Sequence, residues 1–150
     1  MSDKLKAFWS ARPWWMNVLL AFCAYMTFVY MPFDLFYKPV AQDQEVWFGL
    51  MLTGWWAKAT APLHWLIYGF GFYGFLRMKN WMFPWASLYV VQVAIGFFVF
   101  SAMRGNWVAG LVSGLLFGLL AFYLWRARPL FQASGAITSA AVGDESDRLS

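Results

Sequence analysis

The chain has 150 residues, a length that suits a single domain. Its residues are 62% hydrophobic, 23% aromatic and only 12% charged, and the mean hydropathy is +0.54. About a quarter of the residues of a soluble domain are charged, so this composition excludes an ordinary soluble protein and predicts an integral membrane protein. The net charge of +4 comes from basic residues that flank apolar segments rather than from one basic block, which argues against a nucleic-acid partner.

Four apolar segments predict four transmembrane helices, at about 14–33, 60–76, 83–103 and 107–125. At about 1.5 Å per residue, each is long enough to cross a hydrocarbon core of about 30 Å. Backbone groups in lipid must be paired within their own segment, which favours helices. The first run is too long and aromatic for a signal peptide, so we expect it to be retained. The predicted fold is an all-α integral membrane protein, a four-transmembrane-helix bundle over residues 1–128.

The connection between the first two predicted helices, residues 34–59, is the longest. Its first half carries Asp34, Asp43 and Glu45, whereas its second half, "VWFGLMLTGWWA", is apolar on all sides. An unbroken helix over 43–76 would be about 50 Å long, too long for an ordinary span. We therefore predict an apolar re-entrant or interfacial segment at about 46–58, with a bend near Gly54 or Pro62.

Basic residues near the helix ends predict the orientation. Seven fall on one side, Lys4, Lys6, Arg12, Arg77, Lys79, Arg126 and Arg128, and three on the other, Lys38, Lys58 and Arg104. The positive-inside rule then places both termini in the cytoplasm, with the chain in the cell (inner) membrane. Residues 129–150 are small and polar, and acidic near the end, so we expect a disordered cytoplasmic tail.

Glycines recur in two of the predicted helices. Gly69, Gly71 and Gly74 form a Gly-x-Gly-x-x-Gly string, but inside a helix their amides are already bonded, which argues against nucleotide binding. In the last helix Gly110, Gly114 and Gly118 recur every four residues. Small residues let transmembrane helices approach closely, so this stripe predicts helix packing, a homo-oligomer or assembly into a larger membrane complex.

His64 is the only histidine and lies inside a predicted span, where ionisable side chains are rare and are functional by default. Near the outer edge of its helix it could also be a hydrogen-bonded structural residue, which is the simpler interpretation. The functional hypothesis is a ligand-binding pocket on the outer side, lined by His64, Tyr68, Tyr30 and Asp34 and covered by residues 47–56. Asp34 is the expected acceptor for the imidazole. Gln92 is expected to form an interhelical hydrogen bond.

Three functions remain open. The first is a non-catalytic accessory or assembly partner of a membrane complex. The second is a binder or carrier of a flat apolar ligand such as a quinone, carotenoid or sterol-like lipid, since aromatic residues surround the second helix. The third is an outer-face enzyme that uses His64 with a carboxylate. No metal-ligand spacing is present, so we expect no metal and no cofactor. The expected small-molecule partners are membrane lipid and such an apolar molecule.

Overall fold

The computed structural model describes residues 9, 10 and 12–132. Two helices and a short π-helical turn follow one another without a break, α2 (Trp14–Tyr25), η1 (Met26–Tyr30) and α3 (Met31–Phe36). A 3-10 turn, η2 (Val40–Gln42), leads into two antiparallel strands, β1 (Gln44–Trp47) and β2 (Leu50–Thr53). Three long helices complete the described chain: α4 (Trp55–Arg77), α5 (Met82–Met103) and α6 (Trp107–Arg126).

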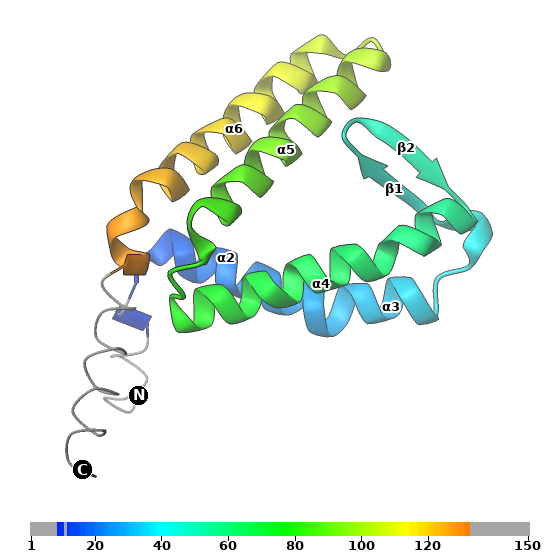
Figure 1. Cartoon of the computed structure of the whole chain (residues 1–150). Helices are drawn as coiled ribbons and strands as arrows, with labels where there is room; N and C mark the ends of the chain where they lie inside the picture. Colours follow the sequence, from blue (N-terminus) through cyan, green and yellow to red (C-terminus); the bar gives the residue numbers. More distant parts are fainter. Residues whose placement is uncertain (1–8, 11, 133–150) are drawn as a thin grey trace, which may run out of the picture.

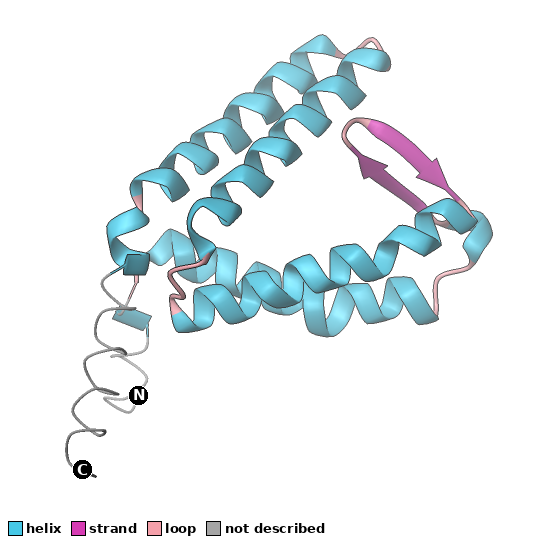
Figure 2. Ribbon diagram, viewed as in Figure 1, coloured by secondary structure: helices cyan, strands magenta, loops and turns pink. Residues whose placement is uncertain are grey.

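The long helices form two antiparallel pairs that diverge like the arms of a V (Figure 1). One pair is α2–η1–α3 against α4, and the other is α5 against α6. The two pairs meet where α4 turns into α5, and the β-hairpin lies between them at the wide end (Figure 2). The predicted helices are therefore present, but they form two diverging pairs rather than one compact four-helix bundle.

Three helices within the described part of the chain are long and apolar enough to cross a membrane: Trp14–Phe36, Met82–Met103 and Trp107–Arg126. The chain is therefore a multi-pass membrane protein by helix length and composition. The fourth predicted span corresponds to α4, which is not in this set. It has the length of a span, but Lys58, Thr60 and His64 lower the hydropathy of its first half.

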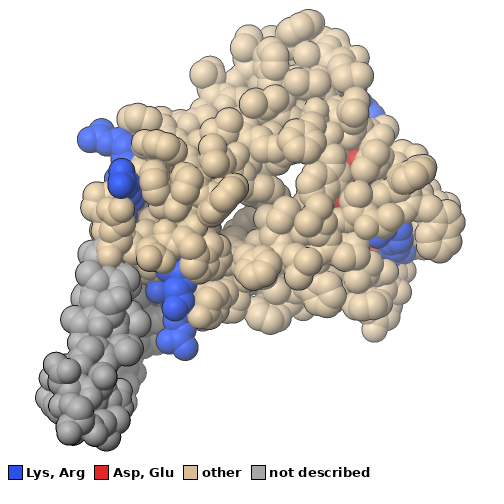
Figure 3. Space-filling model, in the orientation of Figure 1, with Lys and Arg blue, Asp and Glu red and all other residues tan. Residues whose placement is uncertain are grey.

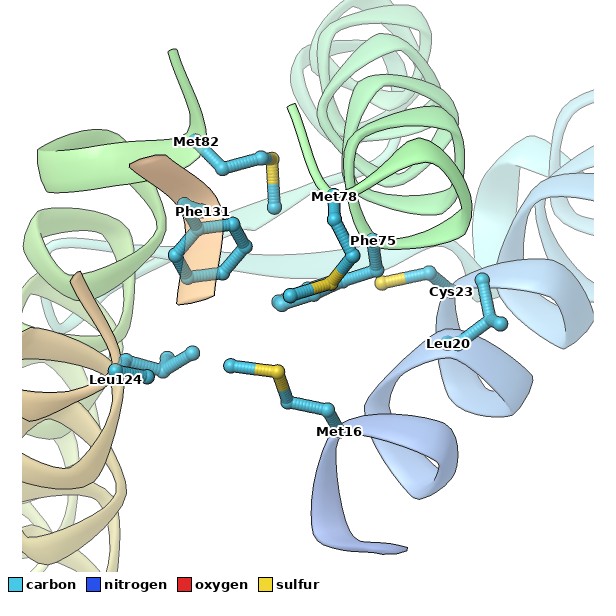
Figure 4. Packing of buried hydrophobic residues seen from close by; sticks show 9 residues of the cluster. Met16, Leu20, Cys23, Phe75, Met78, Met82, Leu124 and Phe131 are labelled. Atoms are coloured by element: carbon cyan, nitrogen blue, oxygen red, sulfur yellow. The ribbon is translucent and has the colours of Figure 1, made fainter. Parts of the chain in front are cut away.

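The hydrophobic core lies at the narrow end of the V, where side chains from α2, α4, α5 and α6 converge (Figure 4). Met16, Leu124 and Phe131 are almost completely buried there. Phe131 falls within the tail predicted to be disordered, yet residues 128–132 are helical and the Phe131 ring packs 6.2 Å from that of Phe75. That prediction is therefore wrong for residues 129–132, and 133–150 lie outside the described residues.

Arg12 ties the start of the first helix pair to the end of α4. Its side chain is only 6% exposed, and Nη1 donates to the Phe75 carbonyl at 2.6 Å and to the Leu76 carbonyl at 3.4 Å. The last carbonyls of a helix have no partner within the helix and carry a partial negative charge. A guanidinium at this point satisfies them and holds the narrow end together.

The segment predicted to be re-entrant or interfacial, 46–58, contains most of a β-hairpin and the start of α4. Residues 44–53 form two paired strands, and the rest of that segment begins α4. The turn residues Phe48 and Gly49 have φ angles of 50° and 87°, and two positive φ values suit the twist of a two-residue hairpin turn. The expected bend occurs at Gly54, with a φ angle of 63°, where α4 starts, whereas α4 continues through Pro62.

Glycines allow close approach between α5 and α6. On α6, Gly110 and Gly114 face α5, where an added Cβ would lie 3.1 Å from the Phe98 carbonyl and 3.7 Å from the Phe98 Cβ, respectively. Gly118 has open space around it. The stripe predicted for packing or self-association therefore packs mainly within the chain, between α5 and α6.

We expect Gly49→Val to loosen the hairpin from α5. The tip packs so closely that a Cβ on Gly49 would lie 2.5 Å from Val99 Cγ1, and a positive φ angle is strained for a β-branched residue. The expected result is a loss of about 2 kcal/mol in unfolding free energy and faster proteolysis between residues 44 and 54 in detergent. Gly118→Val, on an open face, is the control, and equal losses in both variants would contradict the close docking.

Candidate functional site

A large apolar cavity lies between the two arms of the V. Its volume is about 410 Å³, and Figure 3 shows the molecule hollowed between the helix pairs. Residues of α2, α4 and α5 supply most of its walls, which are almost entirely apolar and include Phe22, Ile67, Phe70, Trp85, Ala86 and Val90. A volume between about 300 and 1,000 Å³ is typical of small-molecule sites. The cavity is not fully enclosed, so a molecule can enter it from outside the protein.

A second, more polar cavity of about 220 Å³ lies next to it, towards the hairpin. It is lined by Val46 of β1, by His64 and Tyr68 of α4, and by residues of α5 that include Tyr89, Gln92, Phe97 and Phe100. Tyr68 and Tyr89 line both cavities, and their side chains interact with each other across the space between α4 and α5. The two cavities therefore adjoin at this tyrosine pair, with a polar end and an apolar end.

His64 is held on two sides by β1. Its Nδ1 lies 3.2 Å from Glu45 Oε2, and its ring stacks on Trp47 with centroids 4.0 Å apart and an interplanar angle of 12°. The Tyr68 ring lies 6.2 Å away along α4. Both the orientation of the imidazole and the position of Nδ1 are therefore set by the hairpin.

Glu45 is the centre of this arrangement, because one carboxylate oxygen receives three donors. Besides His64, Oε2 accepts from Thr60 Oγ1 at 2.6 Å and from Trp47 Nε1 at 3.1 Å. Burial raises the pKa of Glu45, but the hydrogen bonds from His64, Thr60 and Trp47 outweigh it and leave the pKa below its usual value. Glu45 is therefore an anion that orients His64.

Two aspartates and two lysines hold the other end of the hairpin. Lys38 Nζ lies 2.8 Å from Asp34 Oδ1 and 2.7 Å from Asp43 Oδ1, and Lys58 Nζ lies 3.2 Å from Asp43 Oδ2. Lys58 also donates to the carbonyls of Asp34 and Lys38. Because the Asp43 side chain is completely buried between the lysines, the network fixes the start of β1 to the first turns of α4.

The structure brings together two of the four predicted pocket residues. His64 and Tyr68 line the polar cavity, whereas Tyr30 is 39% exposed and lines neither cavity. Asp34 also lines neither, since its carboxylate is paired with Lys38. The expected acceptor for His64 was therefore wrong, and Glu45 takes that role. Residues 47–56 were expected to cover the pocket. They do so in part, because Trp47 of the hairpin stacks on His64.

Sequence reasoning missed Glu45 and Tyr89, and assigned Gln92 a different role. The Gln92 side chain has no hydrogen-bond partner among the residues that the structure describes, and it lines the polar cavity instead of bridging helices. One signal was present in the sequence: Gln92, Tyr89 and Gly96 share one face of α5. Nothing in the sequence indicated that β1 would lie against this face.

The arrangement can bind and orient a polar group, and the distance between His64 and Glu45 also meets the first requirement of an acid–base pair. Within residues 9, 10 and 12–132, no three His, Cys, Asp or Glu side chains gather in a group that could hold a metal ion. No protein-family model, curated protein or solved structure matches this chain, so its function rests on the geometry of the site.

Proposed function

We propose that this protein binds or carries an apolar, membrane-dissolved ligand in the cavity between its two helix pairs. The observation that carries the proposal is the cavity of about 410 Å³ with apolar, largely aromatic walls, which adjoins a smaller polar cavity at one end. Flat apolar molecules such as a quinone, a carotenoid or a sterol-like lipid suit aromatic walls, because rings stack and pack on them with little loss of side-chain entropy.

The proposal includes the placement of the chain in the cell membrane. In this placement α4 is the fourth span, and the narrow end of the V faces the cytoplasm. Arg12, Arg77, Lys79, Arg126 and Arg128 support this orientation, because each lies at or near a helix end on that side. The hairpin then lies at the outer side, and the open side of the apolar cavity faces the hydrocarbon core.

A second candidate function is that of a non-catalytic accessory subunit or assembly partner. The outward face of α6 favours it, because Gly118 has open space around it and lies among the exposed side chains of Leu115, Leu119 and Phe122. A small residue on an apolar face lets a second transmembrane helix approach closely. This function would place a protein partner on α6, away from the cavity.

Filling the apolar cavity tests the proposal directly. We expect Ala86→Phe to place a ring in the cavity and to lower the amount of lipid-soluble ligand that co-purifies in mild detergent by at least about fivefold. The measurement is organic extraction of the purified protein, followed by mass spectrometry and an absorption spectrum of the extract. Ligand is counted per mole of protein, against the unchanged chain prepared in parallel.

Ala109→Phe is the matched control, because this alanine lies on an exposed part of α6 and lines neither cavity. The control should keep its ligand. If both variants retain the same apolar molecule, or if the unchanged chain brings down a stoichiometric polypeptide and no small molecule, ligand binding in the cavity is wrong, and the second result favours an accessory subunit.

A further inference from the structure

We infer that the polar cavity recognises a hydroxyl group on the ligand, so that the ligand class is a ring-bearing lipid alcohol or phenol rather than a hydrocarbon or a carbonyl-only ring. This inference rests on the proposed function, since it assigns the polar end of the same ligand. It follows from the hydrogen-bonding capacity that the hairpin leaves on His64 and from the unpaired amide of Gln92.

Glu45 determines which nitrogen of His64 can accept a hydrogen bond. The ionised carboxylate can only accept, so Nδ1 must carry the proton that it shares with Glu45 Oε2. In the neutral ring, Nε2 then has a lone pair and no proton. No described residue makes a hydrogen bond to Nε2, and His64 lines the polar cavity. In the neutral ring the open position on His64 is therefore an acceptor, and its complement is an O–H donor.

Gln92 provides the second polar contact. Its amide lines the same cavity from α5 and, among the described residues, has no partner for its N–H groups. Gly96, one turn further along α5, leaves the amide room, since even an added Cβ there would lie 4.0 Å from Gln92 Nε2. A hydroxyl both donates and accepts, so one oxygen can donate to His64 and accept from Gln92.

The walls around these two groups indicate what carries the hydroxyl. Tyr68, Tyr89, Phe97 and Phe100 line the polar cavity, and aromatic walls favour a flat ring. Tyr68 and Tyr89 also line the apolar cavity, so an alkyl or isoprenoid substituent of the ring can pass between them into the larger volume. The expected ligand thus has its hydroxyl at the hairpin and its apolar chain between the helix pairs.

Three matched probes test this inference on the full-length protein in mild detergent. They are 4-decylphenol, its methyl ether 4-decylanisole, which lacks the donor, and decylbenzene, which lacks the oxygen. Native mass spectrometry of equimolar mixtures measures their relative occupancy. We expect the phenol to occupy the protein about threefold to tenfold more than the ether, the ratio that one hydrogen bond supports. Equal occupancy, or preference for the ether, overturns the inference but leaves apolar binding intact.

Two variants test whether His64 and Gln92 cause the preference for the hydroxyl-bearing probe. His64→Phe keeps a ring beneath Trp47 but removes Nε2, and should bring the ratio of phenol to ether close to one. Gln92→Leu, on a different helix, should lower phenol occupancy about threefold to tenfold without changing that of decylbenzene, and it remains informative if His64→Phe does not fold. Leu88→Phe, on an exposed face of α5, should change neither. An unchanged ratio of phenol to decylbenzene in folded Gln92→Leu contradicts the inference, whereas no binding of any probe refutes the proposed function itself.

Discussion

Asp43→Asn is expected to lower the free energy of unfolding by about 2 to 3 kcal/mol. The Asp43 carboxylate is completely buried and contacts both Lys38 and Lys58. Removing its charge leaves two ammonium groups close together with less compensation, and both are only partly open to water. Titration with sodium dodecyl sulfate in mild detergent, followed by circular dichroism, measures the loss.

Asp34→Asn is the matched control, because the Asp34 side chain is also buried, at 3% exposed, but its carboxylate contacts only Lys38. We expect this variant to lose about 1 kcal/mol less than Asp43→Asn, since one charge contact is weakened instead of two. If Asp43→Asn and Asp34→Asn lose the same amount of unfolding free energy, the position of Asp43 between two lysines does not determine the stability of the hairpin.

The same contacts predict how stability depends on pH. Burial raises the pKa of Asp43, but its hydrogen bonds and charge interactions with Lys38 and Lys58 outweigh it and leave the pKa below its usual 3.8. The folded state therefore binds a proton less readily than the unfolded state, and this stability is present above about pH 4 and is lost as the pH falls through the lowered pKa. Asp43→Asn should flatten this acid loss, and an unchanged slope would contradict the assignment.

Glu45→Ala is expected to lower the unfolding free energy by about 3 kcal/mol, because His64 Nδ1 and Trp47 Nε1 lose their acceptor at once. His64 Nδ1 and Trp47 Nε1 would be left without this acceptor in a partly buried site, whereas Thr60 Oγ1 can donate instead to the Ala57 carbonyl at 2.9 Å. The same detergent titration measures the loss. The variant should also lose the preference for 4-decylphenol over 4-decylanisole, because nothing then fixes the proton on Nδ1 of His64.

Glu45→Gln separates charge from hydrogen bonding. The amide oxygen still accepts from Thr60 and Trp47, so the expected loss of unfolding free energy is less than half of that in Glu45→Ala. If the two variants lose the same amount, the charge of Glu45 matters more than its three hydrogen bonds. If neither loses stability, the contact between β1 and α4 does not hold the hairpin in place.

The helices could be predicted because their signal is local. The hydropathy and length of a segment indicate a membrane-crossing helix whatever the segment packs against in the folded protein. Three such helices are present close to their predicted bounds. Segment 60–76 was also predicted as helical, although α4 begins earlier, at Trp55, because Gly54 rather than Pro62 ends the preceding turn. The hairpin was missed because its turn, Phe48–Gly49, lacks the Asn-Gly or Asp-Gly pair that usually marks such turns.

The sequence by itself determined the membrane class, the approximate bounds of three apolar helices, the positions of the basic residues and the fact that His64 is the only histidine. Only the tertiary structure decided that the helix pairs diverge around a cavity, that Phe131 belongs to the core and that Glu45, not Asp34, holds His64. The physical reason is that hydropathy adds up along one segment, whereas a hydrogen bond needs two groups within about 3 Å. That proximity depends on how β1 folds back onto α4 and α5, which no single segment encodes.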